Sequence, residues 1–336
     1  MRAIEYDHTG APEVLHLVER ELPPVADGEV RVRIVVSGVN PTDWKSRSGD
    51  GSALPEPHVP NQDGAGVVDA VGAGVSLTPG QRVWVWDAAY GRTNGTAQEF
   101  VTLPAAQVVA LPDDASFDLG ASLGIPALTA HRALTAFEHA PASLSAGSLD
   151  GRAVLVAGGA GAVGHAAIEL ARWAGATVFS TVSSPEKAEL ARLAGAHHVI
   201  DYRTSDVEKA IRTVRPDGVD IIVEVNPTAN IRLDQSIIAA NGTIALYASD
   251  AAAELTLGVR SNMAKNIRFQ FILTYTTTEA EKTAAVQAVG EAVADGALRV
   301  GAEFGLPLTR FTLEQTADAH AAVEHGAIGK VLIDVA

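Results

Sequence analysis

Three glycines at fixed spacing are the residues that point most directly to chemistry in this sequence. Gly159, Gly161 and Gly164 form a G-x-G-x-x-G pattern between the apolar run Ala153–Ala157 and a helical segment that begins near His165. In such a turn the first glycine allows a tight bend, the second lets the backbone approach a pyrophosphate, and the third lets helix and strand pack closely. Backbone N–H groups at the helix start bind the phosphates. The pattern predicts a dinucleotide site, and its alternative is a simple strand–helix turn.

The end of the next predicted strand distinguishes between the two nicotinamide cofactors. An NAD site usually carries Asp or Glu there, about 20 residues after the glycines. Here Thr177–Val182 is followed by Ser183 and Ser184, and Lys187 lies one turn into the next helix. Hydroxyl groups and a lysine suit a 2′-phosphate, which a carboxylate would repel. We therefore predict NADPH rather than NADH.

Two residues after the third strand, Tyr202 and Arg203, are predicted to close the 2′-phosphate pocket. Glu186 is the one carboxylate in this region, and behind Pro185 we interpret it as part of a helix start. The alternative is that the serines only cap this helix and that Lys187 is an ordinary solvated side chain.

Several kinds of catalytic chemistry are disfavoured by the residues that the chain lacks. Cysteine is absent, which removes thiol nucleophiles and every zinc site that needs a thiolate. Of the ten histidines, only His197 and His198 are adjacent, at a turn that enters a strand. Gly120–Gly124 matches the G-x-S-x-G nucleophile elbow, but a loop and a helix start precede it where the elbow requires a buried strand. We predict no metal site and a metal-independent mechanism.

The elements that must position these residues fall into two patterns. Up to residue 124, short alternating segments such as Val30–Val36, Gly64–Gly72 and Arg82–Trp86 predict a compact β-rich sandwich or barrel. From residue 152 buried strands alternate with helices, which predicts a parallel, doubly wound sheet. The expected strands there are Ala153–Ala157, Thr177–Val182, His198–Ile200, Val219–Val225, Thr243–Ala248 and Arg268–Thr274; the expected helices are His165–Ala174, Pro185–Ala194, Val207–Val214, Asn230–Ala240 and Glu279–Asp295; the tail adds strands Val300–Phe304 and Lys330–Val335.

Composition limits the classes of partner. The chain has 336 residues, 47% of them hydrophobic and 19% charged, which is enough for two domains with packed cores. A formal net charge of −15 disfavours both phosphate contacts to nucleic acid and docking on an anionic membrane. The sequence shows no secretory signal and no apolar run long enough to span a bilayer, so we expect a cytoplasmic protein.

Four motifs in order resemble one known family. Gly38–Asp43, Asn61–Gly72, Gly124–Leu134 and Ala157–Gly164 are similar to the medium-chain dehydrogenase/reductase superfamily, and within it to the zinc-free quinone oxidoreductase (zeta-crystallin-like) branch. The resemblance runs essentially end to end. The positions at which zinc-dependent members carry their metal ligands hold Asn40, Gln62 and Ile125.

The resemblance implies an α/β architecture of two domains. A GroES-like, β-rich catalytic domain would comprise residues 1–124 and be completed by residues 276–336, and a Rossmann NADPH-binding domain would comprise residues 125–275. A homodimer is also expected, because the last strand of the cofactor domain, Arg268–Thr274, is apolar and would leave an open sheet edge.

The resemblance also implies NADPH-dependent reduction of a quinone or an activated enone. Where quinone reductases often carry Tyr, this chain has Lys45, which is commoner in relatives that reduce enones and alkenals. The alternatives therefore remain an enone double-bond reductase, a zinc-dependent alcohol dehydrogenase, and a non-catalytic NADPH-binding protein. The expected catalytic residues are Asn40, Asp43, Lys45 and Tyr90; the expected cofactor contacts are Gly159, Ala160, Gly161, Ala162, Val163, Gly164, Ser183, Ser184, Lys187, Tyr202, Asn230, Tyr247, Ala248, Ser249, Ile272 and Leu273.

Overall fold

The structure is a computed structural model that describes residues 1–249 and 253–336. Its internal contacts divide it into two units: the first comprises Met1–Ile125 with Pro307–Ala336, and the second comprises Pro126–Leu306. Residues 276–306, which the sequence analysis assigns to the first domain, lie in the second unit. The physical reason is α9 (Glu279–Ala294), which packs within that unit: Arg132 forms an ion pair with Glu281 at 3.0 Å, and Ser143 Oγ donates to the Ala284 carbonyl at 3.0 Å.

The second unit contains the predicted parallel sheet. Its strand order is β11-β10-β9-β12-β13-β14, so the direction of winding reverses between β9 and β12, which is where doubly wound sheets bind their ligands. All five residues of β9 are buried, because neighbours cover the strand on both sides and both faces. The strands are β9 (Ala153–Ala157), β10 (Thr177–Val182), β11 (His198–Asp201), β12 (Val219–Glu224), β13 (Ile238–Leu246) and β14 (Arg268–Phe271).

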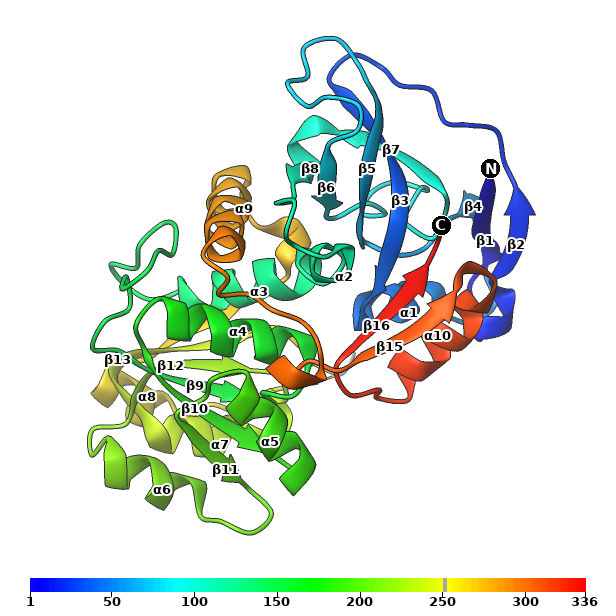
Figure 1. The fold of residues 1–336 in the computed structure, drawn as a ribbon. Coiled ribbons are helices and arrows are strands. Elements are labelled where there is room, and N and C mark those ends of the chain that lie inside the picture. The colour runs from blue at the N-terminus through cyan, green and yellow to red at the C-terminus, as the bar shows by residue number, and fades with distance from the viewer. Residues whose placement is uncertain (250–252) are drawn as a thin grey trace. The chain divides into compact units, whose positions relative to one another are not determined.

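Helices cover both faces of this sheet (Figure 1). α4 and α5 lie on one face against β9, β10 and β11, and α6, α7 and α8 lie on the other against β11, β12 and β13. The helices are α3 (Gly124–Leu134), which begins at the boundary between the units, α4 (Ala162–Trp173), α5 (Pro185–Leu193), α6 (Val207–Val214), α7 (Pro227–Ile237) and α8 (Val259–Lys265). The predicted α/β class and its alternation are confirmed.

The first unit is built around one long strand, β3, which pairs with β5, β7 and β16. A seven-stranded sheet and a three-stranded sheet, β2-β1-β4, enclose an apolar core that includes Ile4, Val32 and Val101. The strands are β1 (Arg2–His8), β2 (His16–Glu19), β3 (Glu29–Val39), β4 (Ala53–His58), β5 (Asp63–Val71), β6 (Arg82–Val85), β7 (Phe100–Pro104), β8 (Val108–Ala110), β15 (Leu308–Thr312) and β16 (Lys330–Asp334), and the helices are α1 (Pro41–Arg47), α2 (Phe117–Gly120) and α10 (Thr316–Glu324).

The predicted strand Val300–Phe304 is wrong. The segment forms a short 3-10 turn over Ala302–Phe304, flanked by Gly301 with φ of 119° and Gly305 with φ of 91°. Two positive-φ residues so close together end any extended run. The strand that enters the sheet is β15, a few residues later.

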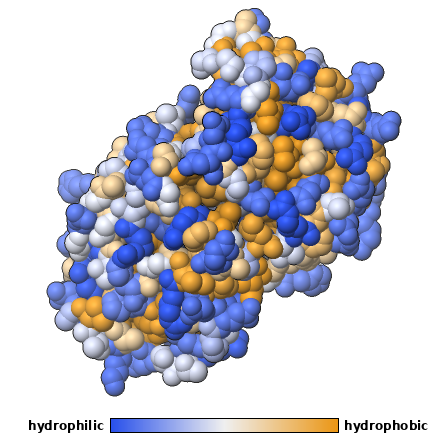
Figure 2. Space-filling model, viewed as in Figure 1, coloured by the Kyte–Doolittle hydropathy of each residue, from blue (hydrophilic) through white to orange (hydrophobic). Residues whose placement is uncertain are grey.

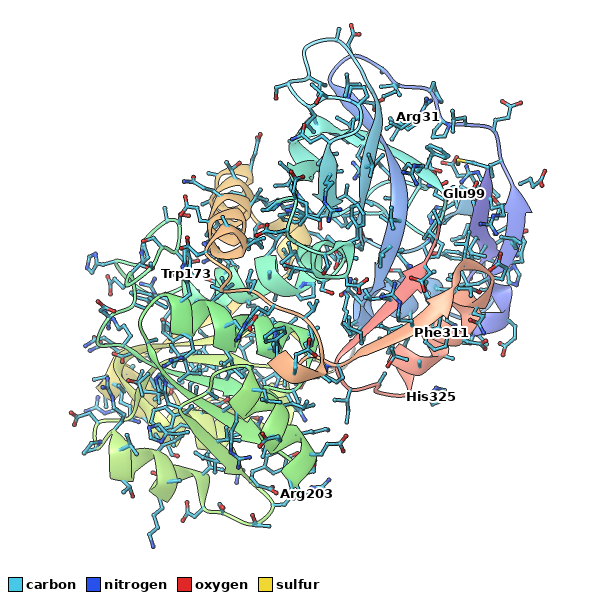
Figure 3. The ribbon with its side chains drawn as sticks, in the orientation of Figure 1. Arg31, Glu99, Trp173, Arg203, Phe311 and His325 are labelled. Carbon is cyan, nitrogen blue, oxygen red and sulfur yellow. The ribbon has the colours of Figure 1, made fainter. Side chains whose placement is uncertain are left out.

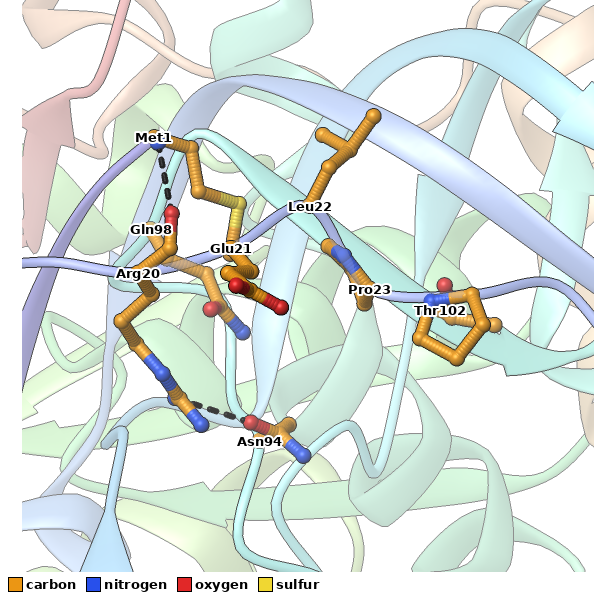
Figure 4. Close-up of a pocket in the computed structure, with 9 residues that line it drawn as sticks. Met1, Arg20, Glu21, Leu22, Pro23, Asn94, Gln98 and Thr102 are labelled. Atoms are coloured by element: carbon orange, nitrogen blue, oxygen red, sulfur yellow. Dashed lines mark hydrogen bonds between the residues drawn. The ribbon is translucent and has the colours of Figure 1, made fainter.

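Polar and apolar side chains are interspersed on the face that Figure 2 displays. Within the described residues, no helix is both long enough and apolar enough to cross a bilayer. A cavity of about 310 Å³ lies in the first unit beside the N-terminal segment (Figure 4). Its rim is fixed by Arg20, which donates to Asn94 Oδ1 at 2.9 Å and accepts from the Met1 amine at 2.8 Å. None of the predicted site residues lines this cavity.

Candidate functional site

The glycine-rich segment of the second unit forms a tight turn between β9 and α4. Gly158 has a φ of 71°, its N–H donates to the Thr181 carbonyl at 3.0 Å, and its own carbonyl accepts from Gly161 N–H at 3.1 Å. α4 then begins at Ala162 with Gly161 as its N-cap. The first-turn N–H groups of a helix have no partner within the helix, so this end of the 12-residue α4 is suited to bind an anion.

Each glycine of this turn has a distinct role. A Cβ on Gly159 would collide with Ser180 Oγ, and one on Gly164 would collide with the Gly158 carbonyl. On Gly161 it would meet only the Gly158 oxygen, at 3.6 Å, so this position stays open to a phosphate. The bend was predicted at Gly159, but the residue with positive φ is Gly158. The pair of adjacent glycines, Gly158 and Gly159, is the feature of the sequence that indicates this.

The predicted 2′-phosphate residues lie together at the ends of β10 and β11. Lys187 Nζ donates to Ser183 Oγ at 3.3 Å, and Tyr202 N–H donates to the Val182 carbonyl at 3.1 Å. Ser184 also caps α5, since its Oγ accepts from Lys187 N–H at 3.3 Å. Ser184 therefore caps the helix while the Lys187 ammonium group lies beside the end of β10, so the two alternatives do not exclude each other. Arg203 follows on the loop after β11 (Figure 3).

The ends of β12 and β13 bring further predicted contacts to the same edge of the sheet. Asn230 Nδ2 donates to Glu224 Oε1 at 3.0 Å, and Tyr247 N–H donates to the Glu224 carbonyl at 3.2 Å. Glu224 is not among the predicted residues, although an acid directly after the apolar run Ile221–Val223 is a signal that the sequence contains. Val225 adjoins the phosphate turn, because a Cβ on Gly158 would lie 3.2 Å from it.

The remaining predicted contacts continue along this edge. Ile272 N–H donates to the Leu246 carbonyl at 2.8 Å, which extends the pairing of β13 with β14. Ala248 is half-buried, while Ser249 and Leu273 are exposed. An open glycine position, a helix N-terminus and a lysine beside the strand end form a set of groups that fits a dinucleotide phosphate.

In the first unit, Asn40 lies within a buried polar cluster. Its Nδ2 donates to Asp63 Oδ2 at 2.7 Å, and its Oδ1 accepts from Lys330 Nζ at 2.7 Å. Lys330 Nζ also lies 3.5 Å from Asp63 Oδ2. All three side chains are at most 2% exposed, so the Asn40 amide is engaged in this buried cluster. Its expected catalytic role remains a prediction.

Asp43, also buried, fixes the turn into α1. Its carboxylate accepts from Asn40 N–H at 2.7 Å and from Gln62 N–H at 3.1 Å. Burial, reinforced by the nearby Asp63, raises the pKa of Asp43 to about 8. Burial also raises the pKa of Asp63 and lowers that of Lys330. The cluster thus contains two acids and one cation, none of which reaches solvent.

Lys45 and Tyr90 are the exposed members of the predicted catalytic set. Lys45 projects from α1 with Nζ 5.9 Å from the centroid of the Trp44 ring. Tyr90 is 44% exposed, whereas Trp84 and Trp86 are buried in the core. Of the four predicted catalytic residues, these two therefore have side chains that solvent reaches.

The positions associated with zinc in related dehydrogenases carry other contacts. Ile125 N–H donates to Asp63 Oδ1 at 2.9 Å, and Gln62 Oε1 accepts from Ala89 N–H at 3.0 Å. Among residues 1–249 and 253–336, no group of three or more His, Asp or Glu side chains is arranged to hold a metal.

The G-x-S-x-G segment does not form a nucleophile elbow. It follows α2 rather than a buried strand, and Ser122 Oγ donates to the Asp118 carbonyl at 2.7 Å. This agrees with the prediction that the motif is incidental.

Comparisons with known proteins cover the whole chain. The alcohol dehydrogenase GroES-like domain family matches residues 26–113, and the zinc-binding dehydrogenase family matches residues 162–291. Human quinone oxidoreductase is 32% identical over 343 residues, covering 99% of this chain and 97% of that protein. A solved mycobacterial protein complexed with NADPH is 29% identical with a TM-score of 0.80, covering 99% of both chains. A solved NAD-dependent alcohol dehydrogenase is 28% identical with a TM-score of 0.83, covering 100% of both.

Two alanine substitutions test the roles of the glycines. Gly164→Ala forces a Cβ against backbone and should destabilise the second unit by about 1–3 kcal/mol, measured by thermal melting. Gly161→Ala fits the folded backbone, whose φ at this position is −87°, so it should leave the melting temperature unchanged but weaken NADPH binding in calorimetry. Unaltered binding by Gly161→Ala would contradict the assignment of the phosphate site.

Proposed function

The chain belongs to the quinone oxidoreductase family of the medium-chain dehydrogenase/reductase superfamily, and from this premise we propose that it is a cytoplasmic, metal-independent enzyme that reduces a quinone with NADPH. The balanced reaction converts a quinone, NADPH and one proton to a hydroquinone and NADP⁺. The observation that carries the proposal is the phosphate turn of the second unit together with the lysine and hydroxyl groups beside it.

The choice of NADPH rests on charge at the ends of β10 and β11. The Lys187 ammonium and the Ser183 hydroxyl are 3.3 Å apart, and both offer hydrogen bonds to a 2′-phosphate. Asp201 is the nearest strand-end carboxylate, and its Oδ1 accepts from Arg203 N–H at 3.0 Å. The similar mycobacterial structure complexed with NADPH supports this choice. The similar NAD-dependent alcohol dehydrogenase supports NADH, so the cofactor preference is tested below.

The acceptor would be bound by exposed groups of the first unit. When bound, NADPH would supply the hydride, and negative charge would then develop on an oxygen of the acceptor. The Lys45 ammonium stabilises that charge, and Tyr90 offers an aromatic face and a hydroxyl to a planar quinone. Asn40 and Asp43 fix the turn from which Lys45 projects. No residue with a thiolate or imidazole occupies the three zinc-associated positions, which supports a reaction without a metal.

A second function, reduction of an enone double bond, is favoured by Lys45 itself. A compact ammonium group suits the localised charge of an enolate at least as well as that of a hydroquinone. A third, catalytically inactive NADPH-binding protein, would bind cofactor without turnover.

Initial rates of NADPH oxidation with a quinone and with an α,β-unsaturated ketone distinguish these functions. We expect faster turnover of the quinone, and Lys45→Met should lower kcat by about tenfold, which corresponds to 1.4 kcal/mol of transition-state stabilisation. The control is Arg33→Met, which alters an exposed cation on β3. Preference for the ketone would favour the second function, and NADPH binding without turnover of either acceptor would favour the third.

Lys187→Ala tests the cofactor. A hydrogen bond to a charged group contributes about 1.5–3 kcal/mol, so KM for NADPH should rise ~10-fold or more while KM for NADH stays the same. The matched control is Arg192→Ala on the same helix, because Arg192 pairs with Glu189 at the surface. An equal change in both KM values would show that Lys187 does not contact the 2′-phosphate.

We also propose that the chain forms a homodimer through β14. This strand is at the edge of the sheet, and four large apolar side chains on α8, on β14 and just after β14 are exposed. An open edge strand and exposed apolar side chains suit antiparallel pairing with a second copy about a twofold axis. The exposed residues are Val259, Met263, Phe271 and Leu273.

Light scattering on the native protein should give twice the chain mass of 34.8 kDa. Phe271→Lys should shift the mass to that of one chain, because a lysine ammonium loses its hydration in the interface. Leu17→Lys, at an exposed apolar residue of β2, should leave the dimer intact. A wild-type protein with the mass of one chain would refute the dimer.

A further inference from the structure

Two carboxyl groups are buried together beneath the edge of the second unit's sheet where the cofactor is proposed to bind. Glu224 ends β12 and is 0% exposed, and Asp234 lies on α7 and is 1% exposed. The two carboxyl groups lie close enough for each to affect the pKa of the other. Glu224 Oε2 and Asp234 Oδ2 have no donor, so a proton between the two groups is the one partner that satisfies both oxygens.

Among the described residues, no Lys, Arg or His side chain forms an ion pair with either of these two acids. The other side-chain and backbone donors to Glu224 Oε1 are neutral, namely Asn226 N–H and Asn230 Nδ2. The cations of α6 and α8 that contact α7 bind carbonyl groups at its C-terminal end. Arg212 of α6 donates to the Ser236 carbonyl, and Lys265 of α8 donates to the carbonyls of Gln235, Ser236 and Ile238.

One further titratable group, Tyr247, follows β13 and interacts with Glu224. The phenol of Tyr247 has a raised pKa because of burial and the Glu224 charge, so it stays neutral and does not compensate the acids. Two ionised carboxylates in such surroundings would repel each other strongly, since the interior screens charge far less than water does.

We propose that Glu224 and Asp234 share one buried proton, and that the pair positions Asn226 and Asn230 at the nucleotide edge of the sheet. The singly charged pair provides a fixed acceptor for both asparagines, and α7 begins at Pro227 directly from this anchor. The second half of this inference rests on the proposed NADPH function, and the first half does not.

The shared proton makes stability depend on pH in a defined direction. Burial, with the Glu224 charge, raises the pKa of Asp234 to about 9, against 3.8 for the ordinary group. The folded protein therefore keeps a proton that the unfolded chain releases throughout this interval. Stability therefore falls as pH rises above the ordinary pKa of 3.8, and it continues to fall until the folded pair loses its proton.

The pair also affects an anionic ligand at this edge. Loss of the proton leaves two negative charges near the phosphate turn, and it removes the bond that holds Glu224 in place for Asn230. Affinity for NADPH should accordingly decline as pH approaches 9 in the wild type.

Asp234→Asn is the direct test, because the amide donates to Glu224 as the protonated acid does but has no proton to lose. Melting temperatures are measured from pH 6 to pH 9, a range below the raised pKa of about 9. The wild type should lose stability across this range more steeply than Asp234→Asn, so the variant's relative melting temperature rises with pH. Asp217→Asn is the control, since this exposed carboxylate should give the wild-type slope.

Parallel pH slopes for the wild type and Asp234→Asn would overturn the shared proton. If Asp234→Asn does not fold, infrared spectra at pH 8 still provide a test. Because Asp43 also holds a proton near this pH, the spectrum of Asp43→Asn is recorded beside that of the wild type. The carbonyl stretch of a protonated carboxylic acid should persist in Asp43→Asn, and its absence there overturns the proposal.

The positioning role is tested by binding of NADPH at pH 7. Asp234→Ala leaves Glu224 without its partner and should raise the Kd for NADPH at least tenfold, while Asp234→Asn should bind as the wild type does. An unchanged Kd in Asp234→Ala would overturn the positioning role. If the wild type itself does not bind NADPH, the proposed function fails while the pH slopes still decide the proton.

Discussion

The buried side chain of Lys330 constrains how the strands of the first unit are arranged around Asn40. Strands β5 and β16 flank β3, and this register brings Asp63 and Lys330 to either side of the turn at Asn40. Removing either charged partner would leave the other buried and unpaired, which typically costs 3–5 kcal/mol. The ion pair therefore joins the last strand of the chain to the loop that begins α1. This cluster also fixes the position of Lys45, because Asn40 and Asp43 cap α1, the helix that carries Lys45.

In the second unit, too, buried polar groups must find partners, and here they lie beside the proposed nucleotide site. Its sheet is buried on both faces, so polar groups gather where the strands end, at the reversal of winding between β9 and β12. Gly158 bends the chain away from β9, and Glu224 ends β12 beside it. One edge thus combines N–H groups for phosphates with a buried acid that orders its neighbours. The acidic surface is compatible with an anionic cofactor because helix N-terminal N–H groups and Lys187 supply the local positive charge.

Much of this arrangement could be predicted from the sequence because its signals are local. A fully apolar run before glycines, followed by a helix, predicts β9, the turn and α4 with few alternatives. Serine and lysine after the next strand likewise predict the cluster around Ser183. The family resemblance added the order of the two domains.

The remaining features depend on contacts between residues far apart in the chain. Nothing near Asn40 in the sequence shows that Lys330, 290 residues later, donates to its amide oxygen. The resemblance places residues 276–306 in the first domain, whereas α9 contacts Arg132 and Ser143 within the second unit. The pairing of Glu224 with Asp234 is likewise invisible until β12 and α7 pack together.

The central claim is that this protein directs a hydride from NADPH to a small-molecule acceptor. It is tested most directly with NADPH carrying deuterium at one or the other of its two C4 positions, each oxidised by the protein in the presence of a quinone. The mass of the NADP⁺ formed is then measured. The account predicts that one labelled form loses its deuterium completely and the other retains it completely. Partial loss from both forms, or no quinone-dependent oxidation, would contradict it.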